Sequence, residues 1–310
     1  MKTSPNPALT AVLAALDRVI LGKSEPVRLA LTCLLARGHL LIEDVPGVGK
    51  TTLAHALAQM LGLAWQRVQF TSDLLPADII GVSVFDAGSG NFTFRKGPIF
   101  TQLLLADEVN RASPKTQSAL LEAMEERQVS VDVTTYRLPD PFFVVATQNP
   151  FEQLGTFRLP ESQLDRFLMR ISLGYPDAAH ERALLTAGDR RDLLSGMAPV
   201  LNPDVVRELQ AAAQRVHVAP ALVGYVQALL ASTRDRSEIR IGLSPRAGQG
   251  LVRAARAWAL LSGRDLTLPE DVQAVFAAVA SHRLEAADAP TGMDHAALVA
   301  DIARSVPVPV

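Results

Sequence analysis

The chain has 310 residues, a hydrophobic content of 48%, a formal net charge of −2 and a pI of about 6.3. This length allows one very large domain or two ordinary ones, the apolar content argues against disorder, and the charge gives no overall bias toward nucleic acid. A single cysteine, Cys33, excludes an intrachain disulfide, and neither a signal peptide nor a membrane-spanning run is recognisable. We therefore expect a soluble, cytoplasmic protein without a membrane partner.

The first part of the chain alternates helical and strand-like patterns. Apolar residues at helical spacing predict a helix over 7–20, and a second helix begins near Ser24 and ends at Gly38. Further helices are expected over 51–61 and 114–126. Strands are predicted at 39–43, 65–70, 103–107, 142–147 and 168–173. The runs LLLAD and FFVVAT are nearly continuous in apolar residues, as expected for parallel strands covered on both faces. The alternation indicates a parallel α/β sheet.

Two segments interrupt this alternation, and the pattern changes again near residue 200. Residues 81–98 predict two short strands around a Gly-Ser-Gly turn, and 129–138 predict a second hairpin. Both are candidate working parts, with the covering of a sheet edge as the alternative. Beyond residue 200 only helical patterns follow, at 203–216, 219–233, 244–262, 269–283 and 293–304. We predict an α/β domain over 1–198 and a smaller all-α domain over 199–310.

The stretch EDVPGVGKTT, residues 43–52, lies between a predicted strand and a predicted helix. Its final Gly-Lys-Thr fits a phosphate-binding loop, although the full spacing asks for glycine where Asp44 stands. Gly47 and the glycine two positions later let backbone amides approach a phosphate. Lys50 would then meet the β- and γ-phosphate oxygens, and Thr51 would supply a hydroxyl to Mg²⁺. A chance glycine-rich loop is the alternative, which the flanking strand and helix disfavour.

Two other predicted strands end in polar residues. LLLADE places Asp107 and Glu108 at a strand's carboxyl end, where α/β sheets bind ligands. Asp107 would hold Mg²⁺ through water, and Glu108 would orient and polarise the attacking water. FFVVATQNP ends at Asn149, whose amide could bridge the γ-phosphate and that water. Each pattern alone is also what an ordinary strand end or an Asn-Pro turn gives. Together with the loop they predict a site that binds a nucleotide through its phosphates and activates a water against the γ-phosphate.

With these elements in order, the chain resembles the AAA+ ATPases, and more closely the MoxR branch of the helix-2-insert group. That family also has Asp at the position of Asp44. It usually has proline where this chain has Arg158, in a loop near the subunit interface. The matching stretches are VILGKSE (19–25), LLIEDVPGVGKTTLA (40–54), VQFTSDLLPADIIG (68–81), LLLADEVNRASPKTQSALLEAMEERQV (103–129), VVATQNPFEQLGTFRLPESQLDRF (144–167) and LSPRA (243–247).

The resemblance implies a three-layer αβα core with a five-stranded parallel sheet, followed by an all-α lid. It implies that Asn149 is sensor 1, that Arg166 is an arginine finger for the neighbouring subunit's γ-phosphate, and that Arg246 is sensor 2. From the residues alone, a salt bridge of Arg166 with Asp165 or Glu161 and a solvated helix end at Arg246 remain the alternatives. The nucleotide-binding set becomes Asp44, Val45, Pro46, Gly47, Val48, Gly49, Lys50, Thr51 and Thr52, with Ile20 and Leu21 near adenine.

The function implied by the resemblance is an ATPase that uses ATP and Mg²⁺, forms a ring, most often a hexamer, and remodels or matures partner proteins, often ones with von Willebrand A domains. A nucleic-acid motor is one alternative, but the cations Arg95, Lys96 and Arg137 of the two hairpins are few for tracking phosphates. A non-hydrolysing nucleotide-dependent scaffold is disfavoured because every expected catalytic group is present. A small-molecule P-loop kinase would leave the helical second domain unexplained.

Overall fold

A five-stranded parallel sheet, with strand order β2-β5-β8-β1-β9, forms the centre of the molecule. The structure is a computed structural model that describes residues 6–88, 90–150, 155–186, 190–287 and 295–308. The sheet contains all five strands predicted from the sequence, which confirms the expected α/β core. Its strands are β1 (Leu40–Glu43), β2 (Trp65–Gln69), β5 (Leu103–Asp107), β8 (Phe143–Gln148) and β9 (Met169–Ile171).

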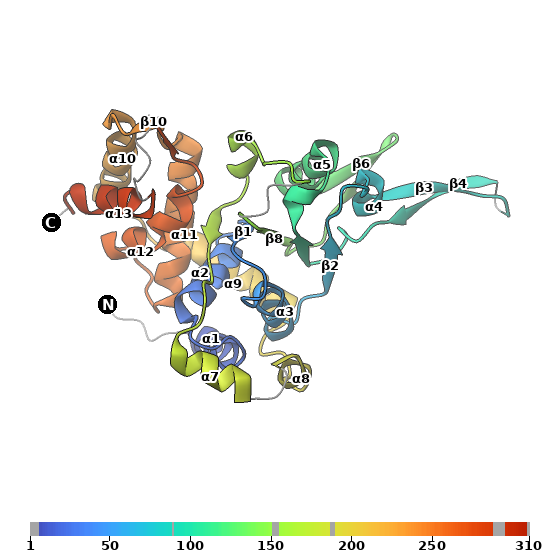
Figure 1. Cartoon of the computed structure of the whole chain (residues 1–310), viewed down its shortest axis with the longest axis horizontal. Coiled ribbons are helices and arrows are strands. Elements are labelled where there is room, and N and C mark those ends of the chain that lie inside the picture. The colour runs from blue at the N-terminus through green and yellow to red at the C-terminus, as the bar shows by residue number, and fades with distance from the viewer. Residues whose placement is uncertain (1–5, 89, 151–154, 187–189, 288–294, 309–310) are drawn as a thin grey trace.

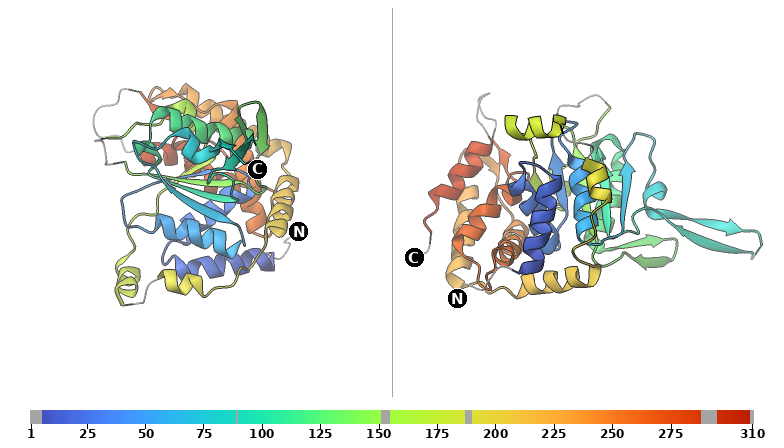
Figure 2. Two further views of the ribbon diagram at one scale, coloured as in Figure 1. Left: turned by 90° about the vertical axis from the view of Figure 1, so that its right-hand side faces the viewer. Right: turned by 90° about the horizontal axis from the view of Figure 1, so that it is seen from below.

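Alternate residues of the central strands enter two different hydrophobic cores. In β5, Leu103 and Leu105 belong to the core on the side of α1, α2 and α3, whereas Leu104 and Ala106 belong to the core that holds α4 and α5. Because both faces are covered, the strands read as apolar runs, and Figure 2 shows the sheet between its two helical layers. These helices are α1 (Pro7–Val19), α2 (Ser24–Leu35), α3 (Lys50–Met60), α4 (Pro76–Ile80) and α5 (Pro114–Glu126).

Both predicted hairpins are present, and the first projects from the core at the end opposite the lid (Figure 1). The second braces it: Ser83 Oγ donates to Asp132 Oδ2 at 2.7 Å, and the rings of Phe94 and Tyr136 stack with centroids 4.2 Å apart. Gly81, with φ +103°, is required at the hairpin base, where a Cβ would lie 2.3 Å from a backbone oxygen. The strands are β3 (Gly81–Asp86), β4 (Asn91–Lys96), β6 (Gln128–Val131) and β7 (Thr134–Arg137).

The second domain is helical, as predicted, but it is not purely so. Strands β10 (Ile239–Ile241) and β11 (Glu285–Ala286) pair antiparallel. No strand was predicted here, because neither segment lies in a run of apolar residues. The lid helices are α9 (Pro203–Arg215), α10 (Pro220–Asp235), α11 (Pro245–Leu261), α12 (Pro269–Ala280) and α13 (His295–Ser305). Short elements of the core that were not predicted are α4, η1 (Val109–Arg111), α6 (Glu161–Leu164), α7 (Ala178–Thr186) and α8 (Arg190–Ser195).

The segment that leads into the lid is bonded to the core. The backbone amides of Val200 and Leu201 both donate to the carbonyl of Met60, at 2.9 and 3.0 Å. The chain therefore enters the second domain, for which a start at residue 199 remains a prediction, while still attached to the end of α3. No helix in the described part of the chain is both long and apolar enough to cross a bilayer.

Candidate active site

The loop between β1 and α3 has the backbone that a phosphate cradle requires. Gly47 and Gly49 have φ of +86° and +97°, which residues with side chains rarely adopt. A Cβ at either position would meet nothing within 4 Å, so the glycines are needed for backbone conformation and the space beside the loop is open. Successive amides in such a loop form a concavity for anions, and the start of α3 at Lys50 adds its partial positive charge.

The Lys50 side chain lies over this loop. Its ammonium donates to the carbonyls of Asp44 and Val45, at 2.5 and 3.1 Å. Burial lowers the pKa of Lys50, while the carboxylates of Asp44, Asp107 and Glu108 oppose that shift. The cation is thus placed between the loop and the acidic ends of the strands.

Asp44 ties the loop to the segment after β9. Its Oδ2 accepts from the amides of Leu173 and Gly174, at 2.6 and 2.7 Å, and from Ser172 Oγ at 2.8 Å. Its Oδ1 accepts from the amide of Val45 at 2.8 Å. Burial opposes the charge of this carboxylate, but the hydrogen bonds outweigh it and lower the pKa of Asp44. The residue therefore anchors the loop where the consensus has glycine.

Asp107, at the end of β5, is nearly buried and has a partner on each oxygen. Oδ1 accepts from Thr147 Oγ1 at 2.6 Å, and Oδ2 accepts from Arg67 Nη2 at 2.7 Å. Arg67 comes from β2, the neighbouring strand, and was not predicted as part of the site. Nothing in the sequence distinguishes it, because only the pairing of β2 with β5 brings it to Asp107.

Glu108 follows Asp107 with φ +55°, a left-handed conformation that turns the chain sharply at the strand end. Its amide donates to Thr147 Oγ1 at 2.9 Å. Its carboxylate accepts from Gln69 Nε2 at 2.7 Å and from Arg111 Nη1 at 3.0 Å. The side chain is thereby held at the carboxyl edge of the sheet, beside the loop.

The strand order brings most of the predicted residues into one cavity of about 340 Å³, although Asp44, Val45 and Val48 of the loop do not line it. Because β1, β8 and β5 are adjacent, their carboxyl ends meet at one edge of the sheet. Ile20 and Leu21, expected near adenine, do not line this cavity, and Ile20 is only 7% exposed in the first hydrophobic core. The lining residues are Pro46, Gly47, Gly49, Lys50, Thr51, Thr52, Arg67, Asp107, Glu108 and Asn149.

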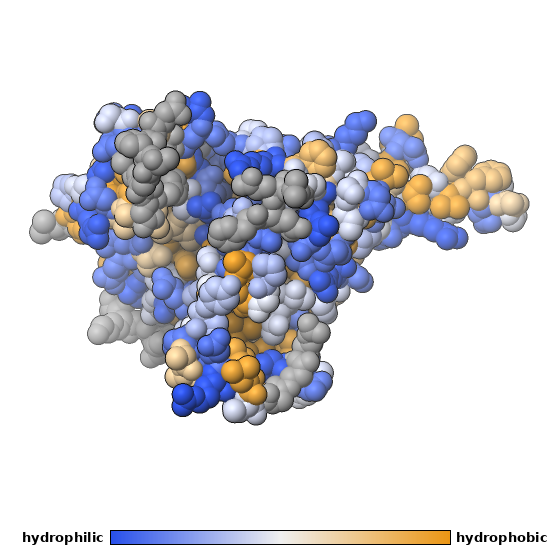
Figure 3. All heavy atoms as spheres, viewed as in Figure 1, coloured by the Kyte–Doolittle hydropathy of each residue, from blue (hydrophilic) through white to orange (hydrophobic). Residues whose placement is uncertain are grey.

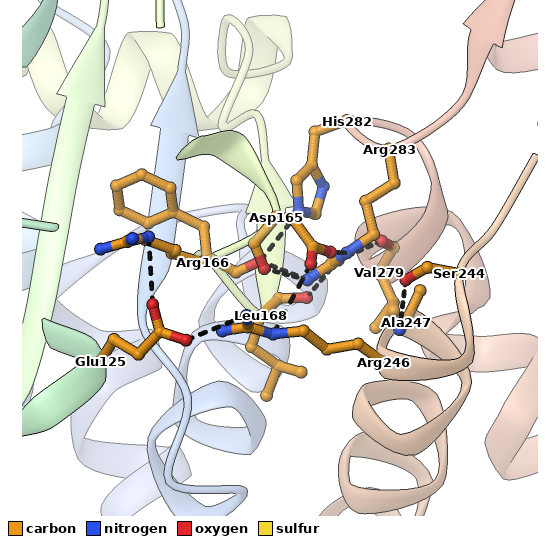
Figure 4. Close-up of polar contacts among 11 residues, drawn as sticks. Glu125, Asp165, Arg166, Leu168, Ser244, Arg246, Ala247, Val279, His282 and Arg283 are labelled. Atoms are coloured by element: carbon orange, nitrogen blue, oxygen red, sulfur yellow. Dashed lines mark hydrogen bonds and ion pairs between the residues drawn. The ribbon is translucent and has the colours of Figure 1, made fainter. Parts of the chain in front are cut away.

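Arg166 and Arg246 lie elsewhere, in a second cavity of about 130 Å³ that shares no lining residue with the first. Both arginines contact Glu125: Arg166 Nε is 3.2 Å from Oε2, and Arg246 Nη1 is 3.0 Å from Oε1 (Figure 4). Arg246 Nε is also 3.6 Å from Asp165 Oδ2. The structure thus joins two residues that the sequence places 80 positions apart, through a glutamate that the sequence analysis did not select.

Comparisons with known proteins agree with this arrangement. Residues 39–169 match the ATPase family associated with various cellular activities (AAA), and residues 231–302 match the AAA lid domain. The chain is 43% identical to YeaC of Bacillus subtilis, over 98% of this chain and 96% of that protein. It is 41% identical to Chaperone MoxR1 of Mycobacterium tuberculosis, over 89% of this chain and 75% of that protein.

A solved structure gives the same result for the fold. The crystal structure assigned to an ATPase from Cytophaga hutchinsonii superposes with a TM-score of 0.87, at 36% identity, and covers 98% of this chain and 95% of that one. Both the α/β core and the helical lid are therefore shared along nearly the whole length. The chain belongs to the MoxR family of AAA+ ATPases.

Proposed function

We propose that this protein hydrolyses ATP with Mg²⁺ in a ring of identical subunits, and that Arg166 and Arg246 act on the ATP held by the next subunit. The observation that carries the proposal is the distance between the two cavities. The phosphate-binding loop follows the last residue of β1. The arginine cavity is lined by Arg37, Gly38 and His39, which precede the first residue of β1.

The two cavities are therefore at opposite edges of the sheet. Strand β1 spans four residues, roughly 13 Å, which exceeds the length of an arginine side chain. Neither arginine can reach the loop of its own subunit while it pairs with Glu125. A second copy that brings its loop to this cavity would supply the missing half of the site, and repeated head-to-tail contacts of that kind close into a ring.

Residues of the first cavity fit a magnesium nucleotide. Loop amides and Lys50 would hold the β- and γ-phosphates, and Thr51 with Asp107 offers the oxygen ligands that Mg²⁺ prefers. The bound metal would offset phosphate charge. Glu108 would take a proton from the attacking water, and Asn149 would orient that water against the γ-phosphate. Arg166 and Arg246 of the neighbour would stabilise the charge that develops as the water attacks in line.

The projecting hairpin supports a protein target for this activity. Val82, Phe85 and Phe92 on β3 and β4 are 47%, 56% and 74% exposed. Figure 3 shows hydrophobic surface (orange) on the projecting hairpin. An exposed apolar surface favours contact with protein over contact with nucleic acid phosphates. The kinship with MoxR proteins supports remodelling or maturation of partner proteins, including ones with von Willebrand A domains.

The steady-state ATPase rate, measured against protein concentration, tests the shared site. We expect the rate per subunit to rise with concentration as subunits assemble. Lys50→Ala and Arg166→Ala should each be inactive alone and regain activity when mixed, because one subunit then supplies an intact loop and the other an intact finger. Glu108→Gln should lower hydrolysis by about 10²–10⁴-fold and keep nucleotide binding.

Arg304→Ala is the matched control, since Arg304 is an exposed arginine at the end of α13. It should keep full activity alone and add nothing to a mixture beyond its own rate. A rate per subunit that is independent of concentration, together with a fully active Arg166→Ala protein, would sink the shared site and favour a monomeric nucleotide switch.

A further inference from the structure

Arg283 lies just beyond α12 in the lid and directs most of its hydrogen bonds to the segment that carries Arg166. Its side chain is 7% exposed. Nε donates to Asp165 Oδ1 at 2.6 Å, and Nη2 donates to the carbonyls of Asp165 and Phe167, at 3.0 and 2.6 Å. Nη1 donates to the carbonyls of Leu168 and Val279. All five N–H donors of the guanidinium are therefore used, four of them on residues 165–168.

His282 adds a second lid contact to the same segment. Its Nε2 lies 2.9 Å from the carbonyl oxygen of Phe167. That oxygen can only accept, so Nε2 carries the hydrogen, and burial keeps the ring neutral by lowering the pKa of His282 well below its usual range. The carbonyls on both sides of Arg166, those of Asp165 and Phe167, are thus held by the lid. The core holds the same segment through the amide of Leu168, which donates to the backbone carbonyl of His39 at 2.8 Å.

Arg246 reaches the same segment from another lid helix. Ser244 caps α11 by accepting from the amide of Ala247 at 3.1 Å, which places Arg246 in the first helical turn. Arg246 then contacts the Asp165 carboxylate on the oxygen that Arg283 leaves open, and contacts Glu125 beside Arg166. Charges alternate along the chain of contacts in Figure 4, which runs Arg283, Asp165, Arg246, Glu125, Arg166.

We propose that Arg283 is a positioning residue, which ties the arginine-finger segment to the lid so that Arg166 and Arg246 are presented to the neighbour as one unit. The inference rests on the proposed shared site. Arg283 touches neither the phosphate-binding loop nor any residue of the first cavity. Its effect should therefore appear only in the subunit that donates the finger, and not in the subunit that holds ATP.

Mixtures of two variant subunits distinguish an effect in the subunit that donates the finger from an effect in the subunit that holds ATP. Donor subunits carry Lys50→Ala and acceptor subunits carry Arg166→Ala. We expect Arg283→Gln on the donor to lower the rate of the mixture about tenfold or more, because a displaced finger loses its alignment. The same change on the acceptor should leave the rate within about twofold of the parent mixture, since that subunit's own finger is already absent.

Arg264→Gln is the matched control for damage to the lid. Arg264 pairs with the fully buried Asp271, and with Glu270 at 3.0 Å. Neither partner belongs to the chain of contacts that leads to Arg166. We expect it to lower the melting temperature at least as much as Arg283→Gln, yet to act equally on donor and acceptor. Arg283→Lys should recover stability more fully than donor activity, because an ammonium has three donors and no planar fork.

Equal loss from Arg283→Gln on donor and acceptor, or the same donor bias from Arg264→Gln, would overturn the inference and reduce Arg283 to a structural contact between lid and core. A parent mixture of Lys50→Ala with Arg166→Ala that stays inactive would instead overturn the shared site itself, and the positioning role would fall with it. The two failures are therefore distinguishable within one experiment.

Discussion

At the scale of single residues, Asp44 stands at the first position of the phosphate-binding loop, and its carboxylate accepts four hydrogen bonds. Three of them come from residues 172–174, which follow β9, the strand next to β1. Because φ at this position is not positive, glycine has no conformational advantage here. The aspartate instead couples the loop to the neighbouring strand.

Asp44→Asn is expected to lower the free energy of unfolding by about 1–3 kcal/mol near neutral pH. The NH₂ of the asparagine would face backbone N–H groups and the Ser172 hydroxyl, which donate to the carboxylate in the wild type. Burial opposes the charge, yet the hydrogen bonds prevail and the folded pKa of Asp44 is lowered. The contribution of the carboxylate is therefore fully present above the unfolded pKa of about 3.9, and is lost as pH falls through the lower folded value.

Urea titrations of the wild type and Asp44→Asn over a pH series would measure this difference. The difference in free energy of unfolding between the two proteins should be constant above about pH 5 and should shrink below about pH 4. A gap that stays the same down to the acid limit of folding would show that the charge of Asp44 contributes nothing. Asp265→Asn, at an exposed position of the lid, serves as the control and should differ from the wild type by close to zero at every pH.

The sequence predicted the site where its residues are neighbours in the chain or end adjacent strands. The loop, Asp107, Glu108 and Asn149 were predicted this way, and they line one cavity because strand ends in a parallel sheet converge. Arg67 was missed because its contact with Asp107 depends on strand pairing. Arg283 was missed because its partner Asp165 is 118 residues away, and a long-range polar contact leaves no periodic signal in one sequence.

At the scale of elements, α5 links the two cavities. Glu108 is followed by η1, and α5 begins soon after it. The last turn of α5 carries Glu125. The 13 residues of the helix span about 20 Å, from the carboxyl ends of the strands to their amino ends. Ser113 caps its start by accepting from the amide of Thr116. The main strands were predicted chiefly from apolar runs and α5 from its helical spacing, whereas β10 and β11 lie in no run of apolar residues.

The hairpin of β3 and β4 gives a prediction at this scale. Replacing Phe85 and Phe92 together by Ser should abolish stimulation of the ATPase by a permanently unfolded protein. The two exposed rings, with centroids 5.4 Å apart, form the apolar surface that such a protein would contact. Basal hydrolysis should remain within about twofold, since the hairpin lies outside the nucleotide cavity.

Thr93→Ala on the same hairpin is the matched control and should keep the stimulation. Rates with and without reduced, carboxymethylated α-lactalbumin would provide the measurement. Full stimulation of the doubly substituted protein would place the contact with partner proteins elsewhere on the molecule.

At the scale of the whole molecule, lid and core together build the arginine face. Arg166 comes from the core and Arg246 from the lid, and Glu125 contacts both. The αβα core and the following lid were predictable in outline, because AAA+ motifs mark them. The docking of lid on core was not, since it depends on side chains that meet only in three dimensions.

Loss of the two arginines should not be additive. Arg166→Ala, Arg246→Ala and the double variant are each expected to lower the ATPase rate by about 10²–10³-fold, because the pair acts as a unit on one developing charge. Each should retain magnesium nucleotide binding in its own loop, as measured by titration with a fluorescent analogue. A loss of binding by dilute Arg246→Ala subunits would assign Arg246 to the nucleotide of its own subunit instead.

In the proposed ring, each subunit carries a socket, the loop, and a plug, the two arginines, at opposite ends of the strands of one sheet. In any open row of copies, the socket at one end and the plug at the other stay idle. A pair of subunits would then complete one site of two, whereas closure completes all of them at once. Activity per subunit would therefore report the topology of the assembly, and a variant that only prevents closure would stay partly active.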